Sequence, residues 1–150
     1  MFKIFYEDLT VGHKEAFGAY EVTKEEVIDF ASKYDPQPFH LDEEFAKQSV
    51  FGALCASGWH TSAMMMRMMV DHMMEAGLAG LGSPGIDGIE WKKPVFPGNI
   101  LSVESEVTGK RESQSRPNIG LVKSTYHVKN QNGEIVMIMR GNVMVAKRNK

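Results

Sequence analysis

Two side chains that can exchange protons lie close together in the segment Tyr34-Asp35-Pro36-Gln37-Pro38-Phe39-His40-Leu41-Asp42. A carboxylate (Asp35) and an imidazole (His40) on one short segment can hold and polarise a water molecule between them. Pro36 and Pro38 fix φ, lack an N–H and keep the preceding residue out of the helical region, so the backbone here should be stiff. The alternative is an ordinary turn with a cap-like Asp35 and a structurally hydrogen-bonded His40.

A second segment, Ala53-Leu54-Cys55-Ala56-Ser57-Gly58-Trp59-His60, leads from an apolar run into a long predicted helix. The N-terminus of a helix has unpaired N–H groups and carries about half a positive charge. Gly58 would let a substrate carbonyl approach the backbone, and its N–H would stabilise a thioester carbonyl as it gains enolate character. The alternative is that Ser57 is an N-cap and Gly58 a packing glycine.

Together these segments resemble the hydratase motif of the MaoC-like dehydratases, a family that includes the (R)-specific enoyl-CoA hydratases and adopts the hot-dog fold. The resemblance also covers Pro94-Val-Phe-Pro-Gly98-Asn-Ile-Leu and spans roughly residues 5–146. It implies that Asp35 and His40 are catalytic and bind one water, and that the Gly58 N–H polarises the thioester carbonyl. The water would add to Cβ of a trans-2-enoyl thioester; the reverse reaction would dehydrate an (R)-3-hydroxyacyl thioester.

The chain departs from the usual family pattern at two places. Gln37 stands where asparagine is usual, and Ser57-Gly58-Trp59 stands where His-Gly-Met is usual. We expect these residues to contact the substrate or to orient the dyad. The implied substrate is an acyl thioester of coenzyme A or of acyl-carrier protein, with no separate cofactor.

Two other functions are compatible with the sequence. One is a hot-dog acyl-CoA thioesterase, whose carboxylate would lie on the central helix, where only Asp71 and Glu75 are available. The other is a non-catalytic protein that binds acyl thioesters.

Three helices are expected in the first half of the chain. Thr23 and Glu26 have the spacing of a capping box for a helix that ends near Tyr34. Asp42 can cap a short helix from Glu43 to about Gln48. The longest helix should run from about Ser57-Gly58 to Ala76, where Gly77 can terminate it.

A helical wheel divides the surface of the longest helix into an apolar arc and an opposite polar stripe. The arc consists of Trp59, Ala63, Met65, Met66, Met69, Val70, Met73 and Met74, and the stripe of His60, Arg67, Asp71 and Glu75, with Met64 and Met68 intruding on it. We expect the methionines to fill the core, although some could line an acyl tunnel.

After residue 86 apolar and polar residues alternate as they do in strands. The predicted strands lie at about 86–96, 101–113, 122–128 and 135–145, with a hairpin turn at 130–133 and a short strand near Glu15–Tyr20. Hairpins predict an antiparallel sheet, and a sheet curled around one apolar helix is an α+β roll, which is the hot-dog architecture. Pairing with a second copy would protect an exposed edge, so we expect a homodimer.

Composition narrows the functional class. A chain of 150 residues is expected to form one domain over residues 1–150. The net charge of −2 and the absence of a basic block before Lys147-Arg148-Asn149-Lys150 argue against a nucleic-acid partner. The single cysteine, Cys55, and the lack of a long apolar stretch favour a cytoplasmic protein without a membrane partner. His13, His72 and His127 lack metal-ligand spacing, so no metal site is expected.

Several cations have no assigned role. Lys92, Lys93, Arg111 and Arg116 could meet the phosphates of coenzyme A or be ordinary solvated charges. Arg140 interrupts an apolar strand and needs a partner.

Overall fold

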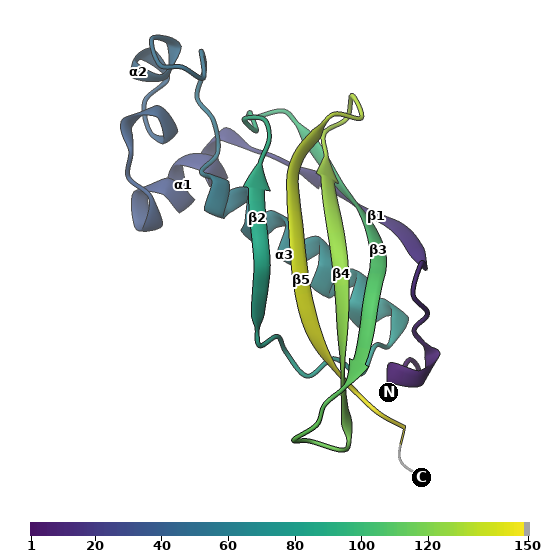
Figure 1. Cartoon of the computed structure of the whole chain (residues 1–150). Coiled ribbons are helices and arrows are strands. Elements are labelled where there is room, and N and C mark those ends of the chain that lie inside the picture. Colours follow the sequence, from purple (N-terminus) through teal and green to yellow (C-terminus); the bar gives the residue numbers. More distant parts are fainter. Residues whose placement is uncertain (149–150) are drawn as a thin grey trace.

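The computed structural model describes residues 1–148 and consists of a five-stranded antiparallel sheet with one long helix lying along its face (Figure 1). The elements in chain order are η1 (Tyr6–Asp8), β1 (Lys14–Glu21), α1 (Lys24–Tyr34), η2 (Pro38–His40), α2 (Glu43–Lys47), α3 (Gly58–Ala76), β2 (Gly85–Trp91), β3 (Ile100–Glu112), β4 (Ile119–Lys129) and β5 (Ile135–Ala146). The strands are ordered β1-β3-β4-β5-β2, so β1 and β2 form the edges. The α+β hot-dog architecture is confirmed.

The core lies between α3 and the inner face of the sheet. Met64 and Met65 of α3 are 2% and 0% exposed, and Val103 of β3, Val128 of β4 and Met137 of β5 are fully buried. The alternation predicted from the sequence therefore marks the buried face of these strands. Flexible methionines fill the space between helix and sheet, as expected.

The outward face of α3 differs from the predicted apolar arc. Met64 and Met68 are buried, whereas Trp59, Met66, Val70 and Met74 are 41–71% exposed. The helix is apolar over much of its circumference, and the sheet covers only one side of it. The helical wheel therefore could not predict which apolar side of α3 the sheet would cover.

The prediction of His60 in the polar stripe was wrong. His60 is 3% exposed, its ring stacks on Phe30 of α1, and its Nε2 lies 3.2 Å from Oε1 of Glu26. Its Nδ1 has no hydrogen-bond partner in the part of the chain described. The position is buried because α1 packs against α3 there.

The predicted helix ends are confirmed, but the capping box is only partly formed. The Thr23 hydroxyl accepts a hydrogen bond from the Glu26 N–H (3.2 Å). The Glu26 carboxylate instead accepts hydrogen bonds from the Tyr20 hydroxyl and from His60, and so ties β1, α1 and α3 together. Gly77 ends α3 with a φ of +79°.

The first predicted strand of the second half was too long, because β2 ends at Trp91. Pro94 lacks an N–H and stops the pairing with β5. Val95 is nevertheless buried, and its carbonyl accepts a hydrogen bond from the Ala56 N–H just before α3 (2.8 Å). The loop after β2 is thereby fixed beside the start of the central helix.

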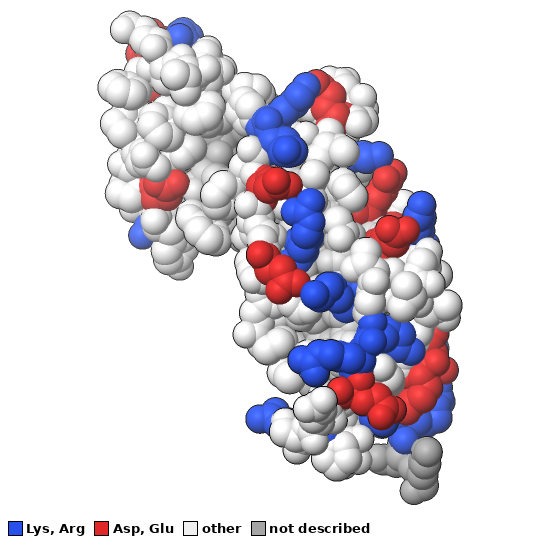
Figure 2. Space-filling view, in the orientation of Figure 1, with Lys and Arg blue, Asp and Glu red and all other residues white. Residues whose placement is uncertain are grey.

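Charges of both signs alternate over the outer face of the sheet (Figure 2). Arg140, whose partner was unknown from the sequence, lies 3.3 Å from a carboxylate oxygen of Glu90 on β2. Lys123 and Asp87 form a second cross-strand pair. Within residues 1–148 no helix is both long and apolar enough to cross a bilayer.

Candidate active site

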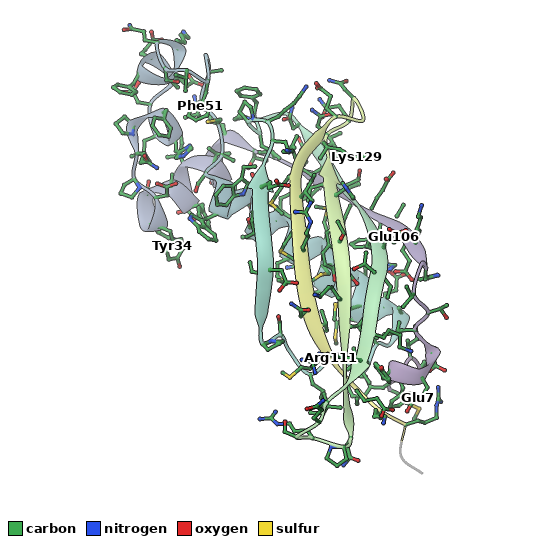
Figure 3. All side chains as sticks on the ribbon, in the orientation of Figure 1. Glu7, Tyr34, Phe51, Glu106, Arg111 and Lys129 are labelled. Atoms are coloured by element: carbon green, nitrogen blue, oxygen red, sulfur yellow. The ribbon has the colours of Figure 1, made fainter. Side chains whose placement is uncertain are left out.

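The proline-braced segment and the N-terminus of α3 meet at one end of the molecule. Figure 3 places Tyr34 and Phe51 at this end and Glu7 and Arg111 at the opposite end. A pocket of about 460 Å³ opens here. It is lined by Asp35, Gln37, Phe39, His40, Phe51, Cys55, Ala56, Gly58, Trp59, Thr61, Trp91, Lys92, Lys93, Pro94 and Val95.

The local backbone explains how the two proton-exchanging side chains are oriented. Helix α1 ends when the Asp35 N–H bonds to the Ala31 carbonyl (2.9 Å), because Pro36 cannot continue the helix. Pro38 then starts η2, and the His40 N–H bonds to the Gln37 carbonyl (2.9 Å). Two tight turns thus bring the side chains of Asp35 and His40 to the same side.

Asp35 is an almost buried carboxylate with two close donors. Its Oδ1 accepts a hydrogen bond from the Gln37 amide (2.7 Å), and its Oδ2 accepts one from the Ser57 hydroxyl (2.6 Å). Burial raises the pKa of Asp35, but the hydrogen bonds from Ser57 and Gln37, together with nearby His40, outweigh burial and hold the pKa below its ordinary value. Asp35 is therefore ionised at neutral pH.

His40 is buried and is fixed in one tautomer when neutral. Its Nδ1 lies 2.7 Å from the Cys55 carbonyl oxygen, which can only accept, so Nδ1 must carry a hydrogen. Its Nε2 points to Oδ2 of Asp35 at 3.4 Å, longer than an ordinary N–H···O hydrogen bond. In the neutral ring Nε2 is an acceptor. One water molecule can therefore donate a hydrogen bond to Nε2 of His40 and another to Oδ2 of Asp35.

Gly58 is the first residue of α3, and Trp91 packs directly against it. A Cβ atom at position 58 would lie 2.6 Å from two carbons of the Trp91 indole, so only glycine fits without movement of Trp91. Among the described residues the Gly58 N–H has no hydrogen-bond acceptor. A free N–H at the positive end of a long helix beside the dyad is suited to bind a carbonyl oxygen.

The other residues singled out from the sequence take different positions. Trp59 lines the pocket but is 59% exposed, and its ring meets that of Trp91 edge-on. Lys92 and Lys93 stand at the same pocket, whereas Asp71 is exposed and paired with Arg67. That exposed ion pair is an unsuitable nucleophile or base for a thioesterase.

Sequence reasoning missed two contributors to the site. Trp91 was assigned only to a strand, and nothing in its spacing indicated that it would cover Gly58. The Cys55 carbonyl, which orients His40, is a backbone group and leaves no residue-type signal. Cys55 itself is buried, as expected, and burial raises the pKa of its thiol to about 11, so it is not a nucleophile at neutral pH.

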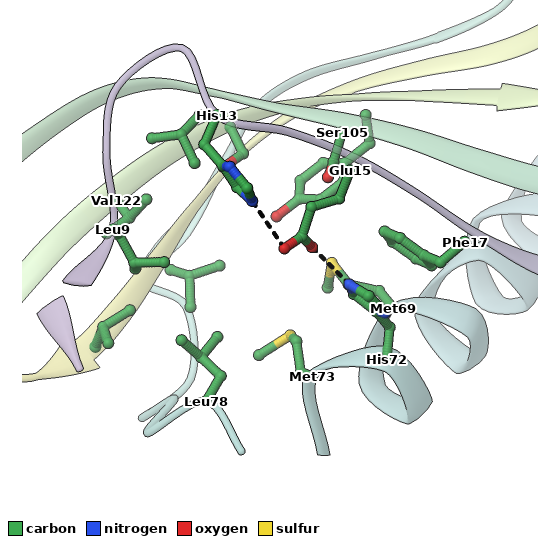
Figure 4. A pocket seen from close by; sticks show the side chains of 15 residues that line it. Leu9, His13, Glu15, Phe17, Met69, His72, Met73, Leu78, Ser105 and Val122 are labelled. Atoms are coloured by element: carbon green, nitrogen blue, oxygen red, sulfur yellow. Dashed lines mark hydrogen bonds and ion pairs between the residues drawn. The ribbon is translucent and has the colours of Figure 1, made fainter. Parts of the chain in front are cut away.

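A second, smaller pocket of about 90 Å³ lies near the C-terminal half of α3 (Figure 4). There the Glu15 carboxylate accepts hydrogen bonds from His13 (3.0 Å) and His72 (2.5 Å), and His72 stacks on Phe17. The remaining walls are mainly apolar. Glu15 thus joins the N-terminal loop to α3. No group of three or more His, Cys, Asp or Glu in the described part of the chain is placed to hold a metal ion.

A family model described as the MaoC like domain matches residues 10–131. The chain belongs to the MaoC-like dehydratase family. A curated relative, the 3-hydroxybutyryl-CoA dehydratase of Methylorubrum extorquens, is 29% identical over 105 residues, which cover 69% of this chain and 64% of that protein. The uncharacterized protein YdeM of Bacillus subtilis is 28% identical and is matched over 89% of this chain and 97% of its own length.

Solved structures of family members have the same fold. The MaoC-like dehydratase of Rhodospirillum rubrum superposes with a TM-score of 0.88 at 39% identity, covering 99% of this chain and 100% of that one. The R-hydratase PhaJ1 of Pseudomonas aeruginosa gives a TM-score of 0.72 at 24% identity over 97% of this chain and 87% of that one. The second likeness supports the fold alone.

Proposed function

We propose that this protein adds water to trans-2-enoyl-CoA thioesters to give (R)-3-hydroxyacyl-CoA, and catalyses the reverse dehydration. The observation that carries the proposal is the pair of acceptors, Oδ2 of Asp35 and Nε2 of His40, which lie 3.4 Å apart in the pocket that Gly58 also lines. Membership of a dehydratase family and the name of the Methylorubrum relative support the same reaction class.

In this proposal a water molecule donates one hydrogen to Asp35 Oδ2 and the other to His40 Nε2. Its lone pairs then face the substrate. As the oxygen bonds to Cβ, one proton passes to His40 Nε2, because the lowered pKa makes Asp35 the poorer proton acceptor. The imidazolium is stabilised by Asp35 and returns the proton to Cα, so hydroxyl and hydrogen both come from the one water.

The Gly58 N–H would supply the electrophilic half of the site. Addition at Cβ moves negative charge onto the thioester oxygen, and a fixed donor at the N-terminus of α3 stabilises that charge. Removing one such donor from an oxyanion site typically costs about 10²–10³ in rate. No metal or redox cofactor enters these steps.

We propose coenzyme A as the carrier and a short acyl chain as the first substrate to test. The relative named for 3-hydroxybutyryl-CoA supports a four-carbon acyl group. Phe39, Phe51 and the Trp59–Trp91 pair offer apolar walls for the acyl group, and Lys92 and Lys93 offer positive charge at the same pocket. Acyl-carrier protein is the alternative carrier. We also propose that the protein works in the cytoplasm, where its single, buried Cys55 would stay reduced.

We further propose that the protein is a homodimer. One edge strand, β2, exposes Ile86 and Trp91 at 47% and 45%, and α3 exposes Met66 and Val70 at 44% and 41%. Large apolar side chains repeated along an edge strand and a helix favour burial against a second copy. Light scattering should give the mass of a dimer, and Val70→Asp should shift the mass toward a monomer. A monomeric wild type at micromolar concentration contradicts the dimer proposal.

A panel of trans-2-enoyl-CoAs of increasing chain length tests the function. Loss of the enone absorbance, together with chiral identification of (R)-3-hydroxyacyl-CoA, is the expected result. Release of free thiol from acyl-CoA without hydration would instead indicate a thioesterase. Tight binding without either change would indicate a non-catalytic acyl-thioester-binding protein.

A further inference from the structure

Ser57 does not behave as the N-cap that its position before α3 suggests. An N-cap serine normally accepts a hydrogen bond from an N–H of the first helical turn. Ser57 makes no such bond, although it is the residue immediately before the helix. Its hydroxyl points away from the helix and donates to Oδ2 of Asp35, 2.6 Å away. The Ser57 hydroxyl therefore binds the Asp35 carboxylate and does not cap the helix.

The position of this hydroxyl is fixed from several sides. Ser57 has no exposed surface, and its carbonyl accepts hydrogen bonds from the N–H (3.0 Å) and the hydroxyl (3.4 Å) of Thr61. The donor therefore cannot swing freely to another acceptor. It meets the same Asp35 oxygen that faces Nε2 of His40.

Gln37 holds the other oxygen of the carboxylate. Because Gln37 donates to Oδ1 and Ser57 donates to Oδ2, rotation of the Asp35 carboxylate would break both hydrogen bonds. A carboxylate has about four acceptor positions, so Oδ2 can still accept a hydrogen bond from a water that lies to one side of the Oδ2–Nε2 pair and contacts both atoms. Charge-assisted hydrogen bonds of this length are among the stronger ones in proteins.

We propose that Ser57 is a positioning residue for the hydration reaction: its hydroxyl aims Asp35 Oδ2 at the water site beside His40 Nε2 and favours the ionised carboxylate. The inference rests on the proposed function. It gives Ser57 a role in orienting Asp35, in place of direct contact with the substrate. Among titratable groups, His40 of η2 lies 3.4 Å from Asp35. Cys55, in the segment before α3, contacts the other ring nitrogen of His40. Lys92 and Lys93 line the same pocket from the loop after β2. Lys93 is paired with Glu134. The Ser57 hydroxyl bonds to Asp35, so we expect Ser57→Ala to leave the other groups unchanged.

The test compares Ser57→Ala with a matched control, Ser62→Ala, five residues further along the chain in α3. The Ser62 hydroxyl donates to the Gly58 carbonyl and does not contact Asp35. We expect Ser57→Ala to lower kcat/KM for crotonyl-CoA hydration by about tenfold, the effect of losing one hydrogen bond to a charged group. The acid limb of its pH profile should move to higher pH, whereas Ser62→Ala should keep the wild-type profile.

A second measurement does not depend on activity. The carboxyl carbon of Asp35, assigned by NMR through its loss in Asp35→Asn, should titrate at higher pH in Ser57→Ala than in the wild type or in Ser62→Ala. Identical titration of Asp35 in all three proteins would overturn the inference, as would a uniform loss of rate at every pH. If the wild type hydrates no enoyl thioester, the proposed function fails, and the titration still decides the role of Ser57.

Discussion

Replacing Gly58 by alanine should destabilise the wild type and stabilise a variant that lacks the Trp91 indole. In the wild type the new Cβ would lie 2.6 Å from the Cδ2 and Cε2 atoms of Trp91. Overpacking of this kind costs about 1–3 kcal/mol, while alanine in place of glycine contributes up to about 1 kcal/mol to a helix. The net cost should be about 0–3 kcal/mol. After Trp91→Ala the clash is gone, and the alanine should stabilise the protein.

Thermal unfolding of the four proteins in this double-mutant cycle measures the effect. At this chain length about 1 kcal/mol corresponds to about 2–4 °C in Tm. We expect Gly58→Ala to lower Tm by up to about 12 °C in the wild type and to raise it by up to about 4 °C in the Trp91→Ala background. Equal losses in both backgrounds would refute the claim that Trp91 is what restricts position 58. Hydration should fall by about 10²-fold in the single Gly58→Ala variant, because a displaced indole enters the space of the thioester carbonyl.

Three further predictions concern stability. Burial lowers the pKa of His60 despite nearby Glu26, so below about pH 6.5 the unfolded chain binds a proton that the folded chain does not. The free energy of unfolding in urea should therefore fall between about pH 7 and 5, and His60→Leu should remove that part of the fall; unchanged pH dependence would contradict the burial argument. The lowered pKa of Asp35 adds stability that is complete at neutral pH and is lost as the pH falls below about 4. Below about pH 4 the free energy of unfolding of Asp35→Asn should therefore depend less steeply on pH than that of the wild type. An equally steep dependence in both proteins would disprove this account of Asp35. Gly18→Ala should lower stability by about 1–3 kcal/mol, because Gly18 has a φ of +89° and the Met68 side chain occupies the Cβ position, whereas Gly88→Ala has open space and should have little effect. Equal effects of the two alanines in thermal unfolding would refute that account.

Most of the fold could be predicted because its signals are local. The capping residues Thr23 and Asp42, the terminator Gly77 and the alternating pattern of the last three strands each act over a few residues. The extent of β2 was overestimated, because the apolar pair after Trp91 resembles strand sequence although Val95 is buried by a loop contact. Which side of α3 faces the sheet could not be read from an almost entirely apolar helix.

The residues of the candidate site, too, could be predicted where their signals are local and not where they depend on tertiary contacts. Asp35, His40 and Gly58 could be selected because residue type and backbone punctuation mark them. Ser57 had the local signal of an N-cap, and the tertiary contact with Asp35, 22 positions earlier, replaced that role. The assignment of Gln37, Ser57 and Trp59 to substrate contact remains a prediction.

The central claim is that the Asp35 carboxylate holds the water that adds to an enoyl thioester. The most direct measurement is crotonyl-CoA hydration by Asp35→Asn and by Asp42→Asn, a matched control in the same segment. Asp42 caps α2 through the N–H groups of Glu44 and Phe45, and asparagine caps a helix equally well. We predict that Asp42→Asn keeps wild-type turnover and that Asp35→Asn loses hydration by at least about 10²-fold with its secondary structure retained and cooperative unfolding at a somewhat lower Tm. Wild-type turnover in Asp35→Asn would contradict the account.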